Sequence, residues 1–327
     1  MKKKETIFMG LTDIYEKGER LIRKKEFGWL LDAVETGFIV AHDRRILDRY
    51  TFRPQYIDGV APDTACRILG VELATPVIMS AMTMPITAIT DNGLMDVAEG
   101  LKDAGSLMWT GTPIPKNLNK LASVGVPVVA NAKPLKDRDK MFQCLEDIQK
   151  AGVTWVGIET DAGQGTKIQD KPVASDCAPL SLKELKDIRK KVSCPLICKG
   201  VLNRRDAEKC VEAGADGMVV SSHGAHTLDY LPHALQVLEE IVEAVGGKAI
   251  LIADGGFRRG SDVLKGLAFG ASLVGLGRPI LFGLAAEGRD GVRDIIDQIT
   301  EEMKRIMSLI GAEAPGKLTR DMLVEDT

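Results

Sequence analysis

A regular alternation of apolar and amphipathic segments begins at residue 75 and continues to about residue 311. The apolar segments are short and often β-branched, which is typical of buried strands, and the segments between them have helical spacing. The expected strands are residues 75–81, 106–111, 127–132, 154–161, 195–201, 216–223, 249–256 and 272–279. Near-continuous apolar strands separated by helices indicate a parallel sheet with helices on both faces.

Eight strand–helix units of this kind predict an α/β fold, the (β/α)8 TIM barrel, with an N-terminal helical extension. A doubly wound open sheet is the alternative, but it usually has fewer strands and a glycine-rich fingerprint after its first strand, which is missing here. Residues 1–74 are expected to form a helical lead-in that packs on the barrel of residues 75–311. No Pro- or Ser-rich linker divides the chain, so residues 1–327 are predicted to be a single domain.

Composition narrows the functional classes. The net charge of -3, from 43 basic and 46 acidic residues, carries no nucleic-acid signature. No apolar run reaches the roughly 18 residues of a membrane span, and the basic start MKKKETIFMGL is not followed by an apolar signal-peptide region. The six cysteines include no CxxC pair, and free thiols in a reducing compartment are expected. We therefore expect a soluble, cytoplasmic protein.

Polar residues fall where the predicted strands end, which is where TIM barrels place their reactive groups. A single polar residue at a strand end is ordinarily explained by contact with water. A lysine inside an apolar strand, such as Lys199, is harder to explain, because a buried ammonium needs a partner or a bound anion. The strand-end residues are Asn131, Asp161, Lys199, Ser221, Ser222, His223, Asp254, Gly255, Gly256, Gly277 and Arg278.

The stretch VVSSHGAHTLDYLP, residues 219–232, starts a cluster of three of the four histidines, His223, His226 and His233. A metal site, an acid/base site and a polar turn are the alternatives. A metal site is disfavoured because no Asp/Glu cluster accompanies the histidines and because Lys199 would repel a cation. We favour a general base with an auxiliary histidine, and we expect no metal.

The segments after the last two strands, IADGGFRRGSD and LVGLGRP, predict a phosphate site. Loops after strands seven and eight of TIM barrels often bind phosphate through backbone N–H groups near a helix N-terminus. Gly255, Gly256 and Gly277 allow close approach of the backbone, and Arg258 or Arg278 can add a bidentate contact.

These segments resemble a known family, the FMN-dependent α-hydroxy-acid oxidases and dehydrogenases, which include glycolate oxidase and lactate oxidase. The resemblance runs from about residue 53 to 310. PLICKGV, VVSSHGAHTLDYLP, DGGFRRGSDVLK and GRPILFGLAAEGRDGV are similar to the family patterns KGV, SNHGxRQLD, DGGxRRGxDVxKALALGA and GRPxxxxLAxxGExGV. The N-terminal half matches more loosely, through RYTFRPQYIDGVAPDTACRILGVELATPVIMSA.

The resemblance implies FMN as the cofactor, His223 as the active-site base, Asp161 as its partner and Lys199 beside the N1/O2 edge of the flavin. It implies oxidation of a 2-hydroxy acid or a related alcohol or amine, with oxygen or a redox carrier as the electron acceptor, in a homo-tetramer. The other cofactor-binding positions that it implies are Ala81, Met82, Thr83, Gly111, Asn131, Glu159, Ser221, Asp254, Gly255, Gly256, Arg258, Gly277 and Arg278. A non-redox FMN isomerase like the type 2 isopentenyl diphosphate isomerases and a non-catalytic phosphate-binding barrel are the alternatives.

The chain departs from the family pattern on the substrate side. His226 stands where the family has an arginine that holds the substrate carboxylate, and an imidazole is a poor substitute for a guanidinium. Lys133 replaces a tyrosine. His226 and Lys133 are the candidate substrate-binding residues, with solvated loop side chains as the alternative. Further departures fall at Trp29 or Leu30, Pro113, and Ile168 with the adjacent Lys167.

Overall fold

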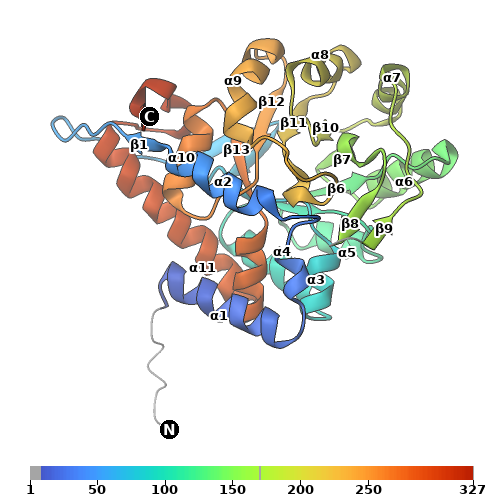
Figure 1. Cartoon of the computed structure of the whole chain (residues 1–327), viewed down its shortest axis with the longest axis horizontal. Helices are drawn as coiled ribbons and strands as arrows, with labels where there is room; N and C mark the ends of the chain where they lie inside the picture. Colours follow the sequence, from blue (N-terminus) through green and yellow to red (C-terminus); the bar gives the residue numbers. More distant parts are fainter. Residues whose placement is uncertain (1–8, 169–170, 327) are drawn as a thin grey trace, which may run out of the picture.

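The computed structural model describes residues 9–168 and 171–326. Its central sheet has eight parallel strands in the order β4-β13-β12-β11-β10-β7-β6-β5. The two end strands approach each other, since the Met79 N–H donates to the Leu107 carbonyl at 3.1 Å, and this closes the barrel. The predicted TIM barrel is thus confirmed (Figure 1). The strands are β4 (Val77–Met79), β5 (Met108–Thr110), β6 (Val128–Ala132), β7 (Trp155–Glu159), β10 (Leu196–Lys199), β11 (Gly217–Val220), β12 (Ile250–Ala253) and β13 (Leu273–Leu276).

Helices follow the strands and cover the outside of the barrel. Side-chain caps start several of them: Asp137, Ser181 and Asn203 each accept a backbone N–H of the first turn. An antiparallel hairpin, β8 (Thr166–Ile168) with β9 (Lys171–Ala174), is inserted after β7. The helices are α3 (Met84–Ile89), α4 (Gly93–Asp103), α5 (Leu118–Ser123), α6 (Arg138–Lys150), α7 (Leu182–Lys191), α8 (Arg204–Ala213), α9 (Ala234–Val245), α10 (Gly260–Ala268) and α11 (Arg278–Ile310).

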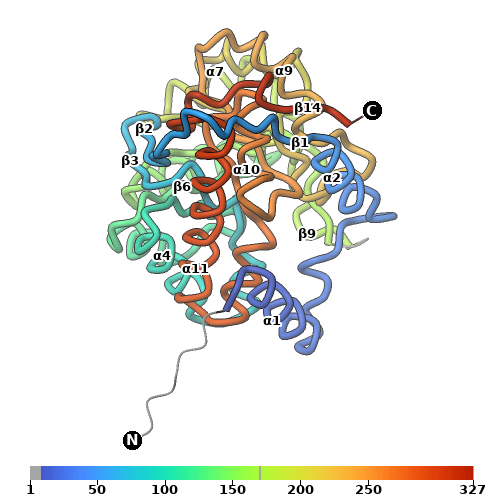
Figure 2. The backbone as a smooth tube through the Cα atoms, turned by 90° about the vertical axis from the view of Figure 1, so that its left-hand side faces the viewer, coloured from blue at the N-terminus to red at the C-terminus, as the bar shows by residue number. Residues whose placement is uncertain are grey.

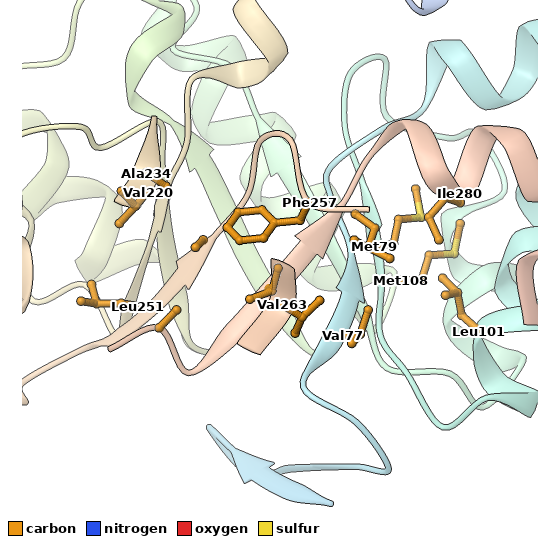
Figure 3. Close-up of a cluster of buried hydrophobic side chains, with 14 of the residues drawn as sticks. Val77, Met79, Leu101, Met108, Val220, Ala234, Leu251, Phe257, Val263 and Ile280 are labelled. Atoms are coloured by element: carbon orange, nitrogen blue, oxygen red, sulfur yellow. The ribbon is translucent and has the colours of Figure 1, made fainter. Parts of the chain in front are cut away.

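Two apolar cores lie on opposite faces of the sheet, because successive strand residues point to opposite sides. Val77 and Met79 of β4 pack outward against the helices together with Val220 and Leu251, as Figure 3 shows. Ile78 points into the barrel, where it joins an inner cluster with the corresponding residues of other strands, including Trp109, Ile197 and Ile252. This alternation directs the last inward residue of each strand toward the mouth of the barrel.

The described part of the lead-in, residues 9–74, contains two α-helices, α1 (Leu11–Lys24) and α2 (Phe38–Asp48), and three short strands, so it is less purely helical than expected. Helix α1 packs against α11 (Figures 1 and 2), where a Cβ at Gly18 would lie 2.2 Å from the Phe282 carbonyl oxygen. Strand β1 (Tyr50–Phe52) pairs antiparallel with β14 (Leu323–Glu325) near the C-terminus (Figure 2). Strands β2 (Cys66–Ile68) and β3 (Val71–Leu73) form a hairpin. None of the described helices has the length and apolar character needed to cross a membrane.

Candidate active site

A cavity of about 420 Å³ opens at the carboxyl ends of the barrel strands. Its volume lies in the usual range of small-molecule and cofactor sites, roughly 300–1,000 Å³. The sequence-predicted residues that line it are Ala81, Met82, Thr83, Gly111, Lys133, Glu159, Lys199, His223, His226, Asp254, Gly255, Gly256, Arg258, Gly277 and Arg278. Asp161, Asn131 and Ser221 lie behind this lining. The structure therefore brings the predicted site together from strands far apart in the sequence.

Asp161 holds the His223 ring in the orientation that a general base needs. Its Nδ1 lies 2.8 Å from Asp161 Oδ2, and because a carboxylate accepts, Nδ1 carries the proton and leaves Nε2 as the basic nitrogen. Burial alone would raise the pKa of Asp161, but the positive charges of His223 and Lys199 outweigh it and lower that pKa to about 2. Asp161 is thus a permanent carboxylate, which favours a positively charged imidazole.

The backbone around His223 is constrained to reach this geometry. His223 has φ +58°, a left-handed conformation that is uncommon for residues other than glycine. Its backbone N–H donates to Ser221 Oγ at 3.0 Å, which explains why Ser221 lies behind the lining. Gly200, with φ +93°, makes room for Asp161, since a Cβ there would lie 2.2 Å from Asp161 Cγ. Gly200 was not among the residues expected from the sequence, although its place in the KGV motif was a signal.

Lys199 ends β10 and points into the barrel mouth. It is 3% exposed, and its Nζ is buried with no hydrogen-bond partner among the described residues. A buried ammonium without a partner is costly, so this atom fits a bound ligand that carries or develops negative charge.

A buried polar chain lies beside Lys199. The Lys133 Nζ and Glu159 Oε2 are 2.6 Å apart, and both side chains are buried. Burial would raise the pKa of Glu159, but the charges of His223, Lys133 and Lys199 lower it overall. Asn131 bridges Glu159 and the Trp109 indole N–H, which donates to Asn131 Oδ1 at 2.8 Å. The structure therefore gives Asn131 a supporting place behind Glu159.

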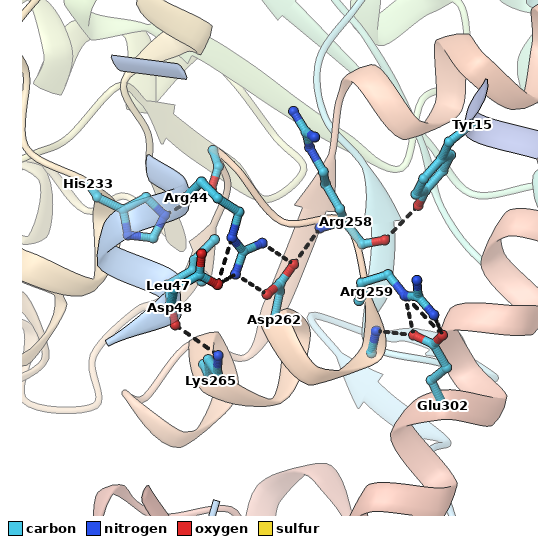
Figure 4. A network of polar contacts seen from close by, with 12 residues as sticks. Tyr15, Arg44, Leu47, Asp48, His233, Arg258, Arg259, Asp262, Lys265 and Glu302 are labelled. Carbon is cyan, nitrogen blue, oxygen red and sulfur yellow. Dashed lines mark hydrogen bonds and ion pairs between the residues drawn. The ribbon is translucent and has the colours of Figure 1, made fainter. Parts of the chain in front are cut away.

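Three glycines and two arginines of the cavity lining form an anion cradle. Gly255 and Gly256 have φ values of +98° and +74°, and a Cβ at Gly277 would have no neighbour within 4 Å. The Arg258 guanidinium has no hydrogen-bond partner in the described part of the chain, and Figure 4 shows it extending away from the contacts that hold its backbone. Arg278 donates its Nε to the Leu31 carbonyl at 2.9 Å and also lines the cavity.

Contacts from outside the barrel fix this cradle (Figure 4). The His233 Nε2 donates to the Gly255 carbonyl at 2.9 Å, because its Nδ1 already accepts the Leu235 N–H. Asp262 accepts the Arg258 backbone N–H at 3.0 Å and is itself held by a bidentate pair with Arg44 of α2. Both ring nitrogens of His233 are therefore engaged in holding the cradle and the start of α9.

Asp43 of α2 is a buried acid beneath the cradle that the sequence analysis missed. It is 3% exposed, its Oδ1 has no partner among the described residues, and a Cβ at Gly256 would lie 2.7 Å from its Cβ. Burial raises the pKa of Asp43 to about 7, although the charges of Arg278 and Arg258 oppose the change. Nothing in the sequence around this aspartate indicates that it lies buried beneath the cradle.

Asp43→Asn should stabilise the ligand-free protein at alkaline pH. The raised pKa means that the unfolded state loses the proton first, so the penalty starts near pH 3.8, grows as pH rises and is complete above about pH 7. The difference between the two pKa values of Asp43, in the unfolded and the folded state, corresponds to a free-energy penalty on the order of 4 kcal/mol. Urea unfolding should show a gain of a few kcal/mol at pH 8 that shrinks toward pH 4. Asp139→Asn, at an exposed position of α6, is the control, and an equal gain there would contradict the assignment.

A family model described as FMN-dependent dehydrogenase matches residues 19–173 and 165–325. The chain belongs to the FMN-dependent dehydrogenase family. Glycolate oxidase 3 of Arabidopsis thaliana is 30% identical to it over 97% of both proteins. A peroxisomal (S)-2-hydroxyacid oxidase of Arabidopsis thaliana is 43% identical over 96% of this chain and 95% of that protein. The crystal structure of mandelate oxidase with (S)-2-phenylpropionate superposes with a TM-score of 0.86 at 29% identity, over 97% and 98% of the chains.

Membership in the FMN-dependent dehydrogenase family makes the protein an FMN-dependent oxidoreductase, which confirms the predicted cofactor and enzyme class. The site fits FMN on its own evidence, because one cavity is lined by an unpartnered buried ammonium and by a diglycine cradle with two arginines. The substrate-side departures also line the cavity: Trp29, Leu30, Pro113, Lys167 and Ile168. Lys133, a candidate for an anionic substrate group, is already paired with Glu159.

Proposed function

We propose that the protein oxidises a small 2-hydroxy acid, or a related alcohol or amine, with His223 as the general base. The observation that carries the proposal is the juxtaposition of the Asp161–His223 pair with the buried, unpartnered Lys199 Nζ in one cavity. Oxidation of an alcohol to a carbonyl compound removes two protons and two electrons, so it needs a base for the hydroxyl proton and a cation that stabilises the negative charge on the electron acceptor.

His223 Nε2 takes the hydroxyl proton of the substrate, and Asp161 stabilises the imidazolium that forms. FMN, when bound, supplies the two-electron acceptor. Lys199 would supply the positive charge that stabilises the electron-rich cofactor, and Ala81, Met82, Thr83, Gly111 and Glu159 would contact its ring system. Asp254, Gly255, Gly256, Arg258, Gly277 and Arg278 would hold its ribityl chain and phosphate.

An anaerobic mixing experiment tests this function. The FMN-loaded protein is mixed with 2-hydroxy acids, alcohols and amines without oxygen, and the flavin absorbance near its visible maximum is followed. Bleaching by a member of these classes, with formation of the matching carbonyl compound, is the expected result. A protein that keeps its absorbance with all three classes and converts an alkene without electron transfer would support the isomerase alternative instead.

Arg258→Ala should weaken FMN binding by about 10- to 100-fold, because a charge-assisted bidentate contact contributes about 1.5–3 kcal/mol. Fluorescence titration of the protein with FMN measures the dissociation constant, and riboflavin, which lacks the phosphate, should lose little. The matched control is Arg259→Ala, since the neighbouring Arg259 pairs with Glu302 on the surface. Equal losses in both variants would show that Arg258 does not bind the phosphate.

We further propose a single-domain, cytoplasmic homo-tetramer that passes electrons to oxygen or a redox carrier. The outer apolar core includes residues from Leu11 to Leu323, which supports one domain. All six cysteines are free, which supports a reducing compartment.

Tyr56 and Ile57 are 74% and 81% exposed, which supports a surface for contact between subunits. Light scattering tests the tetramer, and stopped-flow mixing of the reduced enzyme with oxygen tests the acceptor.

A further inference from the structure

The His226 ring offers the cavity a hydrogen-bond acceptor. Its Nδ1 lies 3.1 Å from the Lys167 carbonyl oxygen, and because a carbonyl only accepts, Nδ1 carries the ring proton. A neutral imidazole has one N–H, so Nε2 holds a lone pair. Burial lowers the pKa of His226 to about 4, and the charge of His223 acts in the same direction. The ring is therefore neutral at physiological pH.

Strand β8 holds His226 in this orientation. The Lys167 N–H donates to the His226 carbonyl at 2.8 Å, while the Lys167 carbonyl accepts from the ring. A flipped ring would leave the Lys167 carbonyl unpaired, which is unfavourable for a partly buried group. Nε2 has no protein partner in residues 9–168 and 171–326, so it is left for a ligand in the cavity that the ring lines.

Two lysines that line the cavity with His226 are already paired. Lys133 pairs with Glu159 at 2.6 Å inside the cavity, and Lys167 pairs with Glu35 at 3.3 Å in a half-exposed position. The positive charges of Arg278 and Lys199 also act on the His226 ring, and the proposed function assigns both residues to the cofactor. A ligand carboxylate at His226 would meet the Nε2 lone pair, and one that reached Lys133 would also meet the Glu159 carboxylate paired with that lysine. Both groups repel a carboxylate.

A primary amide is complementary to the same groups. Its N–H can donate to His226 Nε2. Its carbonyl oxygen can accept from Lys133, whose ammonium has three N–H bonds and gives one to Glu159. An amide brings no net charge near Glu159, so it avoids the repulsion that a carboxylate meets.

We propose that the substrate carries a primary amide where a 2-hydroxy acid has its carboxylate, so that the enzyme oxidises 2-hydroxyamides to 2-oxoamides. The inference rests on the proposed function, since it keeps His223 as the base and FMN as the oxidant. The O–H and α-C–H bonds of the alcohol break and its C–O bond becomes a carbonyl. The hydroxyl proton goes to His223, and the α-hydrogen leaves with two electrons to FMN.

The test compares lactamide with lactate on the FMN-loaded enzyme without oxygen. The second-order rate constant of flavin bleaching should favour lactamide by about tenfold or more, because an unmatched polar group in a site is strongly rejected. A second readout is binding of pyruvamide and pyruvate to the oxidised enzyme, followed by perturbation of the flavin spectrum. Pyruvamide should bind more tightly by a similar factor.

His226→Arg should reverse both preferences, because a guanidinium is a charged donor. His42→Arg is the matched control, since His42 bonds Gln236 outside the cavity, and it should keep the preference for the amide. If His226→Arg does not retain FMN, His226→Gln replaces it and should narrow the preference, because a carboxamide can also donate.

The outcomes separate the inference from the function on which it rests. Bleaching by lactate with tighter binding of pyruvate overturns the inference and leaves the proposed function intact. If neither compound bleaches the flavin, the proposed function fails for this substrate pair, and the binding titration still decides. Tighter binding of pyruvamide then supports the amide site, and equal or weaker binding contradicts it.

Discussion

His223→Gln should slow substrate-driven bleaching of the flavin by about 10³-fold, with FMN binding little changed. A general base contributes typically 10²–10⁴-fold. Glutamine keeps an N–H donor for Asp161 and removes the basic nitrogen, so the buried carboxylate stays paired. Stopped-flow measurement of the bleaching rate at saturating substrate gives the effect on the chemical step, and titration with FMN gives the effect on the cofactor.

The matched control is His42→Gln on α2, where the side chain contacts Gln236. This variant should react at the rate of the parent protein. A His223→Gln enzyme within about threefold of the parent would show that the Asp161–His223 pair is not the base, whatever its geometry. Loss of FMN together with activity would instead indicate that His223 supports the fold of the site.

Lys199→Met should slow bleaching by about 10²-fold and weaken FMN binding. The substitution keeps most of the apolar side chain and removes the buried charge, so it isolates electrostatic stabilisation of the cofactor. If the substitution removes about 2–3 kcal/mol of stabilisation from the reduced cofactor, the midpoint potential of the flavin should fall by roughly 50 mV. The conversion follows because about 30 mV corresponds to 1.4 kcal/mol for a two-electron couple. Spectroelectrochemical titration measures that shift.

Lys199→Arg is the control that keeps the charge. Its midpoint potential should stay closer to that of the parent protein than the midpoint potential of Lys199→Met does. Lys248→Met, at an exposed turn before β12, should change neither quantity. A midpoint potential of Lys199→Met that equals the parent value would show that the ammonium does not face the ring. The unpartnered Nζ would then need another anion.

The barrel was predictable because its signal is local and repeated. Each strand carries its own apolar run, and all eight expected strands contain an observed one. Much of the cavity lining was predictable for a related reason: its residues lie at the carboxyl ends of those strands or in the segments that directly follow them. The position of Lys199 inside an apolar run already required an anion or a partner.

The remaining parts depend on contacts between distant segments. Asp43 and Arg44 reach the cradle from the lead-in, and nothing in their neighbourhood of the sequence indicates this. The hairpin β8–β9 contributes Lys167 to the substrate side through its pairing with His226, which depends on how the hairpin folds back. Asn131 was expected at the flavin ring, but Trp109 and Glu159 hold it behind the cavity wall. Whether such a side chain enters the cavity depends on which neighbours it contacts in the folded protein. The spacing of residues along the sequence does not reveal those contacts.

The paired burial of Lys133 and Glu159 restricts how such a pocket can evolve. Exchange of either residue alone strands an opposite charge in the interior, at a cost of about 3–5 kcal/mol, a large share of the stability of a typical protein. The effect of a substitution at either position therefore depends on the residue at the other. If an ancestor had neutral side chains at both positions, evolution to the present pair is easiest when both codons change in close succession. A library that varies positions 133 and 159 together should consequently contain folded members that no single-site scan reaches.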